Sequence, residues 1–400
     1  MPKDLFTISK KSLYLIIYPF IYLLFVTLNL FKPVKVSLLI TARIGHLALN
    51  TEAFLRNINL KDMGEKQFTI FLADKNNIAN HALYHMWGKN IFIVDNRILR
   101  ILLTPLVYFS SRFYQETPID SNEYDLFNNT MPSLKLSIDD EEKGKKILAK
   151  MGLGKEDWFV CIFARDSAYL KKLYPETDTS YHDYRDADIN TYIEAASYII
   201  DQGGWVIRSG NLVEHKMAFT HEKFIDYPFS EYNSDFMDVF LQIKAKMVIG
   251  TPSGITDVAA IFDTPFCGVN IMPIDYGPIS KNSIFIPKKL REKSTKDFLP
   301  LAKYFDLLDS IELDKQAVYE YYSTQFYRNN NLEIVNNTSE EILDLCKEML
   351  EKLNGESQKT EKDEKLQNQY QLIHSRSLQY GEVKTPIGKE FLKKNEWYIK

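Results

Sequence analysis

The sequence predicts an α/β protein with two successive sets of strands and helices. Short apolar runs, each long enough for one strand, alternate with helical patterns from Val34 to Val94, and a second alternating series runs from Trp158 to Val269. This alternation is typical of βαβ units, in which parallel strands form a sheet with helices on both faces. The chain has 400 residues, more than one ordinary core, so we expect two domains.

The composition is that of a globular protein and disfavours a dedicated nucleic-acid binder. Apolar residues make up 45% and charged residues 26% of the chain, and the net charge is -4. Phosphate backbones favour basic surfaces, so this charge argues against nucleic acid as a partner. Cys161, Cys267 and Cys346 are widely spaced and form no C-x-x-C pair. We expect buried, reduced thiols in a cytosolic protein, with neither zinc nor disulfides.

The N-terminal segment 1–33 is expected to form a membrane-associated helix. Residues 12–31 carry no charge, are mostly apolar and have lysines on either side. The segment is just long enough to span a bilayer, but Pro19 interrupts it. Tyrosines at every fourth position give it one polar-tipped face, namely Tyr14, Tyr18 and Tyr22. We favour a helix that lies on the membrane, while a true span and a buried helix remain open.

The first α/β set is expected to occupy residues 34–136. The strand-like runs are Val34–Thr41, Gln67–Ala73 and Ile91–Val94, and the helical patterns are Leu47–Asn57 and Ile78–Trp87. The polar stretch Asp120–Ser137 has few periodic apolar positions and is interpreted as a linker or long loop.

The second α/β set is expected at residues 137–300. Ser137 is placed to cap a charged helix that ends near Gly152. The strands that follow are Trp158–Phe163, Trp205–Arg208, Met247–Ile249 and Phe266–Val269, and the helices are Ile189–Asp201 and Asp235–Ala245. Residues 137–300 therefore repeat the organisation of the first set.

Residues 301–400 are expected to contribute C-terminal helices and a tail. Thr338 and Glu341 form a capping box, which predicts a helix that ends near Gly355. The charged stretch Glu356–Lys365 is expected to be solvated. The tail Pro386–Tyr398 regains aromatic and apolar content, so we expect it to pack on the rest of the protein.

The turn Gly250-Thr251-Pro252-Ser253-Gly254 is the most informative motif. It joins a short apolar run to a helical segment and offers small residues, hydroxyls and free backbone N–H groups at a helix N-terminus. Such a turn can hold a phosphate. It can also serve only to shape a tight connection between strand and helix. It lacks the lysine of a P-loop, which excludes a Walker site.

Further candidates follow other predicted strands, at the edge where open parallel sheets bind ligands. Arg43, Gly45 and His46 follow the first strand, Arg165 and Asp166 follow the first strand of the second set, and Arg208 and Gly210 follow its second strand. His46 could act as a general base near neutral pH, or it could pack locally. A guanidinium at Arg208 could pair with a phosphate, or it could be a surface group before a glycine turn.

Two polar stretches have both a functional and a structural interpretation. Asp186 and Asp188 form a D-x-D, which binds a metal in one class of glycosyltransferases, but capping of a helix that starts at Ile189 explains the spacing and is favoured. The loop Tyr227–Asp235 could offer rings to a base or sugar, but we favour rings that pack on the core. Ser234 or Asp235 could cap the following helix.

Together these motifs resemble a family of bacterial glycosyltransferases associated with surface-polysaccharide and flagellin-glycan loci. The residues that carry the resemblance are Arg165-Asp166, Tyr181 to Arg185, Val206 to Gly210, Ile225 to Tyr227, Ser234-Asp235, Ile249-Gly250, Ser253-Gly254 and Val269-Asn270, with Arg43 to Leu47 and Ile286 to Lys288. The second half is also distantly similar to the heptosyltransferases. The resemblance covers most of the chain from Val34 to Lys288.

The resemblance implies a GT-B fold, with two Rossmann-like domains that face a central cleft. It implies a nucleotide-sugar donor in the C-terminal domain and a cell-surface glycan or lipid-linked acceptor approached from the N-terminal domain, at the cytoplasmic side of the inner membrane. No cofactor or metal is expected, because basic residues and helix N-termini can stabilise the leaving diphosphate.

The resemblance also suggests roles for individual residues. The donor would be bound by Arg208, Gly210, Thr251, Ser253 and Gly254. The donor or acceptor sugar would contact Arg43, Gly45, Arg165, Asp166 and Arg185. His46 is the expected base that deprotonates the acceptor hydroxyl, with Glu52 as an alternative.

Three rival functions remain open. A sugar-nucleotide 2-epimerase can share the two-domain architecture, and a non-catalytic protein of polysaccharide assembly would need no active site. A serine hydrolase that uses Ser253 is the least favoured. Its motif is G-x-x-S-G rather than the G-x-S-x-G elbow, and no acid and histidine pair follows at recognisable positions.

Overall fold

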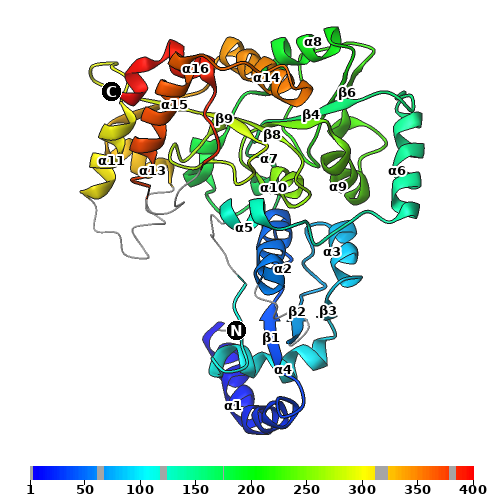
Figure 1. Ribbon diagram of the computed structural model, residues 1–400. Coiled ribbons are helices and arrows are strands. Elements are labelled where there is room, and N and C mark those ends of the chain that lie inside the picture. Colours follow the sequence, from blue (N-terminus) through cyan, green and yellow to red (C-terminus); the bar gives the residue numbers. More distant parts are fainter. Residues whose placement is uncertain (1–2, 61–66, 118–123, 174, 311–322, 378–383) are drawn as a thin grey trace. The chain divides into compact units, whose positions relative to one another are not determined.

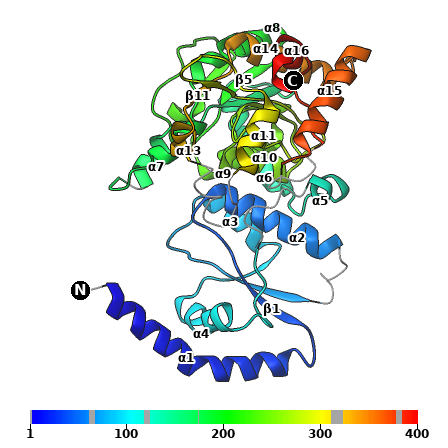
Figure 2. The same cartoon turned by 90° about the vertical axis from the view of Figure 1, so that its left-hand side faces the viewer.

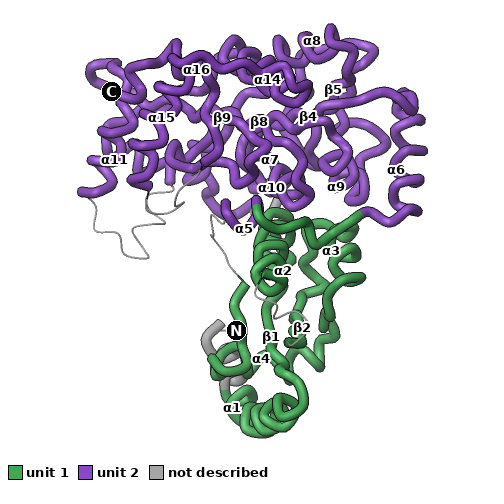
Figure 3. The backbone as a smooth tube through the Cα atoms, in the orientation of Figure 1, with its two compact units in different colours: residues 1–121, 129–135 green, residues 122–128, 136–400 purple. Residues whose placement is uncertain are grey.

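The computed structural model describes residues 3–60, 67–117, 124–173, 175–310, 323–377 and 384–400. The chain divides into two compact units, residues 1–121 with 129–135 and residues 122–128 with 136–400 (Figure 3). Each unit contains a parallel sheet with helices packed on it, so the predicted α/β class is confirmed. The cleft expected between the two domains stays a prediction.

Unit 1 is built on a three-stranded parallel sheet. Its strands are β1 (Val34–Leu38), β2 (Phe68–Leu72) and β3 (Phe92–Val94), in the order β1-β2-β3. A further pairing extends the sheet beyond β1, since Val36 N–H donates to Phe113 O at 2.7 Å and Gln115 N–H donates to Val36 O at 2.9 Å. The three strands lie where the alternating pattern predicts them.

The helices of unit 1 follow the predicted pattern after the first two strands. A short π-helix (His46–Asn50) leads into α2 (Thr51–Leu60), and α3 (His81–Gly88) connects β2 to β3. The Trp87 indole donates a hydrogen bond to Leu47 O at 2.9 Å, which ties α3 to the π-helix. The tryptophan is fully buried, so this bond satisfies its only polar group.

The N-terminal helix α1 (Lys3–Leu28) packs against α4 (Arg97–Phe109) through its row of tyrosines. The Tyr18 hydroxyl donates to Phe109 O at 3.0 Å, and the rings of Tyr22 and Phe113 meet edge to face with centroids 5.2 Å apart. The tyrosine face therefore points into the protein, not toward a membrane interface. No described helix is both long enough and apolar enough to cross a bilayer.

The stretch Asp120–Ser137 is expected from its sequence to be a linker or long loop, but part of it is helical. It contains α5 (Tyr124–Asn129), whose Leu126 and Phe127 are buried in unit 2. Asn128 Nδ2 donates to Ile279 O at 2.8 Å and fixes the end of this short helix. Six residues are too few to display a helical period, which is why the pattern did not reveal α5.

Unit 2 is built on six parallel strands in the order β6-β5-β4-β7-β8-β9. The strands are β4 (Phe159–Phe163), β5 (Trp205–Arg208), β6 (Phe224–Asp226), β7 (Met247–Gly250), β8 (Phe266–Ile271) and β9 (Ile284–Pro287). After β4 the chain adds β5 and β6 on one side of β4, and it then adds β7, β8 and β9 on the other side. The strand order therefore reverses between β4 and β7.

Helices cover both faces of this sheet, so β4, β5 and β7 are almost entirely buried. Figure 1 shows α8 (Ile193–Asp201) above the strands, with α9 (Asp235–Lys244) and α10 (Gly254–Ile261) below. The predicted cap at Ser137 is confirmed for α6 (Ile138–Lys150), since its hydroxyl accepts from Asp140 N–H at 3.2 Å. Ser234 caps α9.

The C-terminal part of the chain packs on unit 2. It comprises α11 (Leu301–Asp309), α13 (Thr324–Asn329), α14 (Ser339–Asn354), α15 (Glu361–His374), α16 (Lys389–Lys394), and the antiparallel pair β10 (Lys289–Glu292) and β11 (Leu332–Val335). The capping box at Thr338 and the left-handed Gly355 after α14 are confirmed.

Two expectations for the C-terminal part are confirmed. The tail packs on the protein as predicted, with Phe391 and Tyr398 buried. The stretch Glu356–Lys365 is exposed except at Asp363, which is buried against Thr360 and Lys393 at the start of α15. The three cysteines are buried and free, as expected.

Candidate functional site

The reversal of strand order places the ends of β4 and β7 side by side, at the position where open α/β sheets bind ligands. Gly250 is the last residue of β7, and the close approach of β4 requires a glycine there, because a Cβ would lie 2.6 Å from Phe163 O. Beyond the strands, Arg165 N–H donates to the buried Thr251 hydroxyl at 3.0 Å. These contacts join the residues after β4 to the predicted phosphate turn.

The turn leads directly into α10 and leaves hydrogen-bonding groups available. Ser253 N–H donates to Thr256 Oγ1 at 3.0 Å, and that hydroxyl donates back to Ser253 O at 2.8 Å. The Ser253 hydroxyl stands at the N-cap of α10 and faces the Thr256 N–H in a capping box, and it makes no closer hydrogen bond among the described residues. The first N–H groups of a helix have no partner within it, so the Gly254 end of α10 offers donors to an anion.

Three basic residues from separate elements lie close together beside this turn. Arg165 follows β4, Arg185 ends a 3₁₀ helix (Ser180–Arg185), and Lys288 follows β9. The Arg185 guanidinium donates to Pro252 O at 2.8 Å, which holds it against the turn. We call Arg165, Arg185 and Lys288 the cation cluster.

The partners within the cation cluster are mostly backbone carbonyls. Lys288 Nζ donates to Tyr184 O at 3.0 Å and to Asp186 O at 2.6 Å, and the lysine is 1% exposed. Arg165 pairs with the Asp186 carboxylate. Arg185 Nε has no partner within the described part of the chain. The cluster thus brings three basic groups together, with Asp186 paired to Arg165 and the carboxylates of Asp166 and Asp183 near that arginine.

The electrostatics of the cluster favour an added anion. Burial, together with the nearby Arg165 and Arg185, lowers the pKa of Lys288 to about 7. Burial and Arg185 lower the pKa of Arg165 to about 10, although Asp183 and Asp166 oppose this. Asp257 of α10 is only partly charged near neutral pH, because burial raises its pKa to about 7 although Arg185 opposes this. An anion bound here would relieve the repulsion between the cations.

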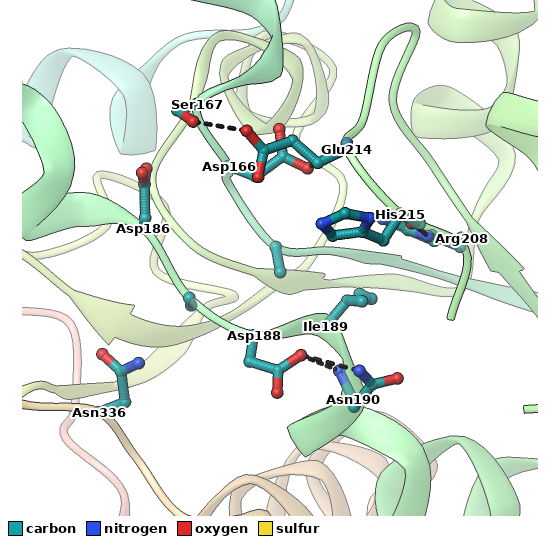
Figure 4. A pocket seen from close by; sticks show the side chains of 12 residues that line it. Asp166, Ser167, Asp186, Asp188, Ile189, Asn190, Arg208, Glu214, His215 and Asn336 are labelled. Atoms are coloured by element: carbon teal, nitrogen blue, oxygen red, sulfur yellow. Dashed lines mark hydrogen bonds between the residues drawn. The ribbon is translucent and has the colours of Figure 1, made fainter. Parts of the chain in front are cut away.

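A polar pocket of about 360 Å³ opens beside the cluster, after β4 and β5 (Figure 4). It is lined by Ala164, Asp166, Ser167, Asp186, Ala187, Asp188, Ile189, Asn190, Arg208, Glu214, His215 and Asn336. Asp166 accepts from Glu214 N–H at 2.9 Å, and the Ser167 hydroxyl donates to Glu214 at 2.7 Å. Carboxylates and amides of this kind suit a ligand that carries hydroxyl groups. Asp186 lines the pocket and pairs with Arg165 of the cation cluster.

The D-x-D has the structural role that the sequence analysis favours. Asp188 caps the 3₁₀ helix at Ile189 by accepting from Asn190 N–H at 2.9 Å, and Asp186 pairs with Arg165. Among the residues that the structure describes, no three histidine, cysteine, aspartate or glutamate side chains are grouped so that they could hold a metal ion.

Arg208 lies at the wall of the pocket rather than against the turn. Its guanidinium is 2% exposed, pairs with Asp226 at 3.3 Å and donates to His215 O at 2.6 Å. Because β4 separates β5 from β7, the ends of these strands are two strand spacings apart, about 10 Å. The donor role of Arg208 stays a prediction. Gly210 has a backbone reason for its identity, since its φ is 122°.

The candidates of unit 1 differ in accessibility. Arg43 is exposed, and Gly45 has ordinary helical dihedral angles. His46 is half-buried, with Nδ1 3.1 Å from Asn50 Oδ1, and a hydrogen bond donated by Nδ1 to that oxygen would leave Nε2 to accept a proton. Glu52 is fully buried and pairs with Arg56 at 2.6 Å. It is held in the interior of unit 1, which removes it as the alternative base.

Lys288 is the residue that the sequence analysis assigned no role. It appeared only in the resemblance, because the strand β9 that positions it was not predicted. The signal that could have found it is the apolar run Ile284–Ile286 that ends in Pro287 and Lys288, which matches a buried strand followed by a polar residue at the sheet edge.

The chain resembles several solved structures at low identity. The glycosyl transferase of family 9 from Veillonella parvula is 10% identical over 71% of this chain and 91% of that chain, with a TM-score of 0.44. ADP-heptose LPS heptosyltransferase II from E. coli is 12% identical over 63% of this chain and 90% of that chain, with a TM-score of 0.39. No family model and no curated protein matches. At these values the likeness is distant and adds no evidence on activity.

Proposed function

We propose that the chain is a glycosyltransferase that binds the diphosphate of a nucleotide-sugar donor at the cation cluster. One observation carries the proposal: the Arg185 guanidinium is held against the turn that leads into α10, and it lies close enough to Arg165 and Lys288 to lower the pKa of both. A diphosphate carries the opposite charge, and charge-assisted hydrogen bonds from guanidinium groups and helix N–H groups are the strong ones.

The polar pocket would take a hydroxyl-bearing part of the same donor. Asp186 joins the two sites, because it lines the pocket and pairs with Arg165 of the cluster. A ligand bound through its diphosphate would therefore reach Asp166, Asp188 and Glu214 with the adjoining ribose or sugar. Carboxylates accept hydrogen bonds from hydroxyls, which would fix the orientation of that group. This supports a donor with hydroxyls close to the diphosphate.

Group transfer would then depend on stabilisation of the leaving diphosphate. Negative charge develops on the leaving oxygen as the glycosidic bond breaks, and fixed cations in a partly buried site stabilise that charge. His46 remains the proposed base for the acceptor hydroxyl, through Nε2. A cell-surface glycan or lipid-linked acceptor, and a location in the cytoplasm at the inner membrane, stay part of this proposal.

The first experiment is a thermal-shift panel of UDP, GDP, dTDP, ADP and CMP, with inorganic phosphate as a reference. A ligand that binds only the folded state raises the melting temperature. We expect one nucleoside diphosphate to raise Tm clearly above phosphate, and Arg185→Ala to abolish most of this rise. If every nucleotide leaves Tm at the value in phosphate, the donor site is not where we place it.

The second experiment tests the reaction with the matching nucleotide sugar. Turnover should require an acceptor, and His46→Ala should lower kcat by roughly 10²–10⁴-fold while nucleotide binding is kept. Appearance of an epimerised donor without an acceptor would instead favour the 2-epimerase. Full turnover of His46→Ala would remove His46 as the base and leave the donor site intact.

A further inference from the structure

The outward face of α1 is mostly apolar from Leu13 to Leu28. Large apolar side chains are exposed at Leu13, Leu15, Ile16, Phe20, Leu23, Leu24 and Leu28, and they continue after the helix at Leu30 and Phe31. Phe20 is 74% and Phe31 is 86% exposed. A surface helix of a soluble protein normally presents polar residues on this side.

The rotation of α1 is fixed by its inner side, so the outward face is not free to turn inward. Phe25 is buried against Phe113, and Tyr18 and Tyr22 hold α4 and the chain after it through the contacts given above. Figure 2 shows α1 running along the outside of unit 1, next to α4. The neighbouring α4 also exposes Ile98 and Tyr108, which extends the apolar surface of this helix pair.

The charges along this face are mostly positive, and Asp74, which pairs with Arg100 of α4, is a carboxylate beside it. No aspartate or glutamate occurs from residue 5 to residue 51, nor from residue 96 to residue 115. Lys32, Arg97 and Arg112 are exposed beside the helix pair. An apolar helix face flanked by cations is complementary to a bilayer that carries anionic headgroups.

We propose that α1 lies flat in the surface of an anionic phospholipid bilayer. The side chains from Leu13 to Leu28 would enter the boundary between headgroups and acyl chains, along about 22 Å of helix. Lys32, Arg97 and Arg112 would contact the phosphates. A second copy of the chain is a poorer occupant, because a two-fold pairing of this face would bring like charges together.

The proposal is tested by sedimentation of the full-length protein with vesicles. We expect the protein to bind vesicles of phosphatidylcholine with 30% phosphatidylglycerol, and to bind pure phosphatidylcholine at least about 10-fold more weakly. The triple variant Leu15→Gln/Phe20→Ser/Leu23→Gln should lose about 10-fold or more of the binding to anionic vesicles. Lys32→Glu/Arg97→Glu should weaken binding to the anionic vesicles only.

Matched controls separate the face from general hydrophobicity. Leu372 on α15 is 75% exposed in unit 2, and Leu372→Gln should sediment like the wild type. The triple variant should keep the wild-type Tm, because all three substituted side chains are exposed. Wild-type sedimentation of the triple variant would overturn the proposal. A wild-type dimer in solution that becomes monomeric in the triple variant would also overturn the proposal, because a second copy would then cover the face. Nucleotide binding is a separate readout, so failure here leaves the proposed function intact.

Discussion

Lys288 shows how one buried side chain can couple ligand binding to protons. Its Nζ is held by two carbonyls, and burial together with two arginines lowers its pKa to about 7. In the free protein the amine is therefore neutral much of the time at slightly alkaline pH. A bound diphosphate would favour the charged form and raise the pKa again.

We predict that nucleoside diphosphate binding takes up a proton at Lys288. Linkage gives an uptake of about half a proton at pH 7, close to one at pH 8 and little below pH 6. Calorimetric titration in buffers of different ionisation enthalpy measures this number. Asp257 would also take up protons near pH 7, since its pKa is raised to about 7.

The control for this prediction is Lys288→Met, which removes the proton uptake of the lysine and leaves that of Asp257. The variant should bind the nucleotide more weakly and take up fewer protons at pH 8, with the remaining uptake coming from Asp257. Uptake equal to that of the wild type at pH 8 would show that Lys288 does not face the ligand.

Arg208 is the residue for which the structure favours a role in stability. Removal of one partner of a buried ion pair costs up to about 3–5 kcal/mol, and less here because Asp226 keeps some access to water. We predict that Arg208→Ala lowers the free energy of unfolding in urea, while affinity for the nucleotide changes by less than about 10-fold. Arg208→Met/Asp226→Asn should recover part of the loss. An affinity loss without a stability loss would restore the predicted donor role.

At the scale of elements, β7, its turn and α10 form the proposed site for anion binding. Two substitutions in it should differ in their main effect. Ser253→Ala removes the N-cap hydroxyl of α10, so we predict a loss of no more than about 0.5–2 kcal/mol in unfolding free energy, and weaker nucleotide binding as the main effect. Gly250→Ala places a methyl group 2.6 Å from Phe163 O, so we predict a loss of about 1–3 kcal/mol in unfolding free energy.

Urea unfolding and nucleotide titration of both variants check this contrast. Gly250→Ala should lose stability even without ligand, because it forces β4 and β7 apart. The element prediction is contradicted if Ser253→Ala binds the nucleotide as tightly as the wild type, since the hydroxyl would then have no ligand role.

Elements with a clear pattern or cap could be predicted, and those positioned by tertiary contacts could not. The caps at Ser137 and Thr338 follow from local hydrogen bonding, so the sequence specifies them. The inward direction of Tyr18 depends on α4, which no local pattern of α1 reveals. Likewise Arg185 and Lys288 meet only because a 3₁₀ helix and β9 end at the same turn.

At the scale of the whole molecule, the two units have separate cores. One core contains Phe25, Val36 and Phe113 of unit 1, and the other contains the strands β4 to β9 of unit 2. The cation cluster and the polar pocket both lie in unit 2. A nucleotide bound there therefore stabilises the fold of unit 2 directly, because only the folded unit assembles the cluster.

We predict that calorimetric unfolding of the full chain contains two transitions, and that the nucleoside diphosphate raises only one of them. Separate cores can unfold separately, and a ligand held in unit 2 adds its binding free energy to that unit alone. Glu52→Gln weakens the buried pair with Arg56 in unit 1 and should lower the other transition. Arg185→Ala should remove the ligand-induced rise and leave the unit 1 transition unchanged. A single transition would mean that the two units unfold as one cooperative structure. A rise of both transitions would mean that residues of unit 1 hold the nucleotide as well.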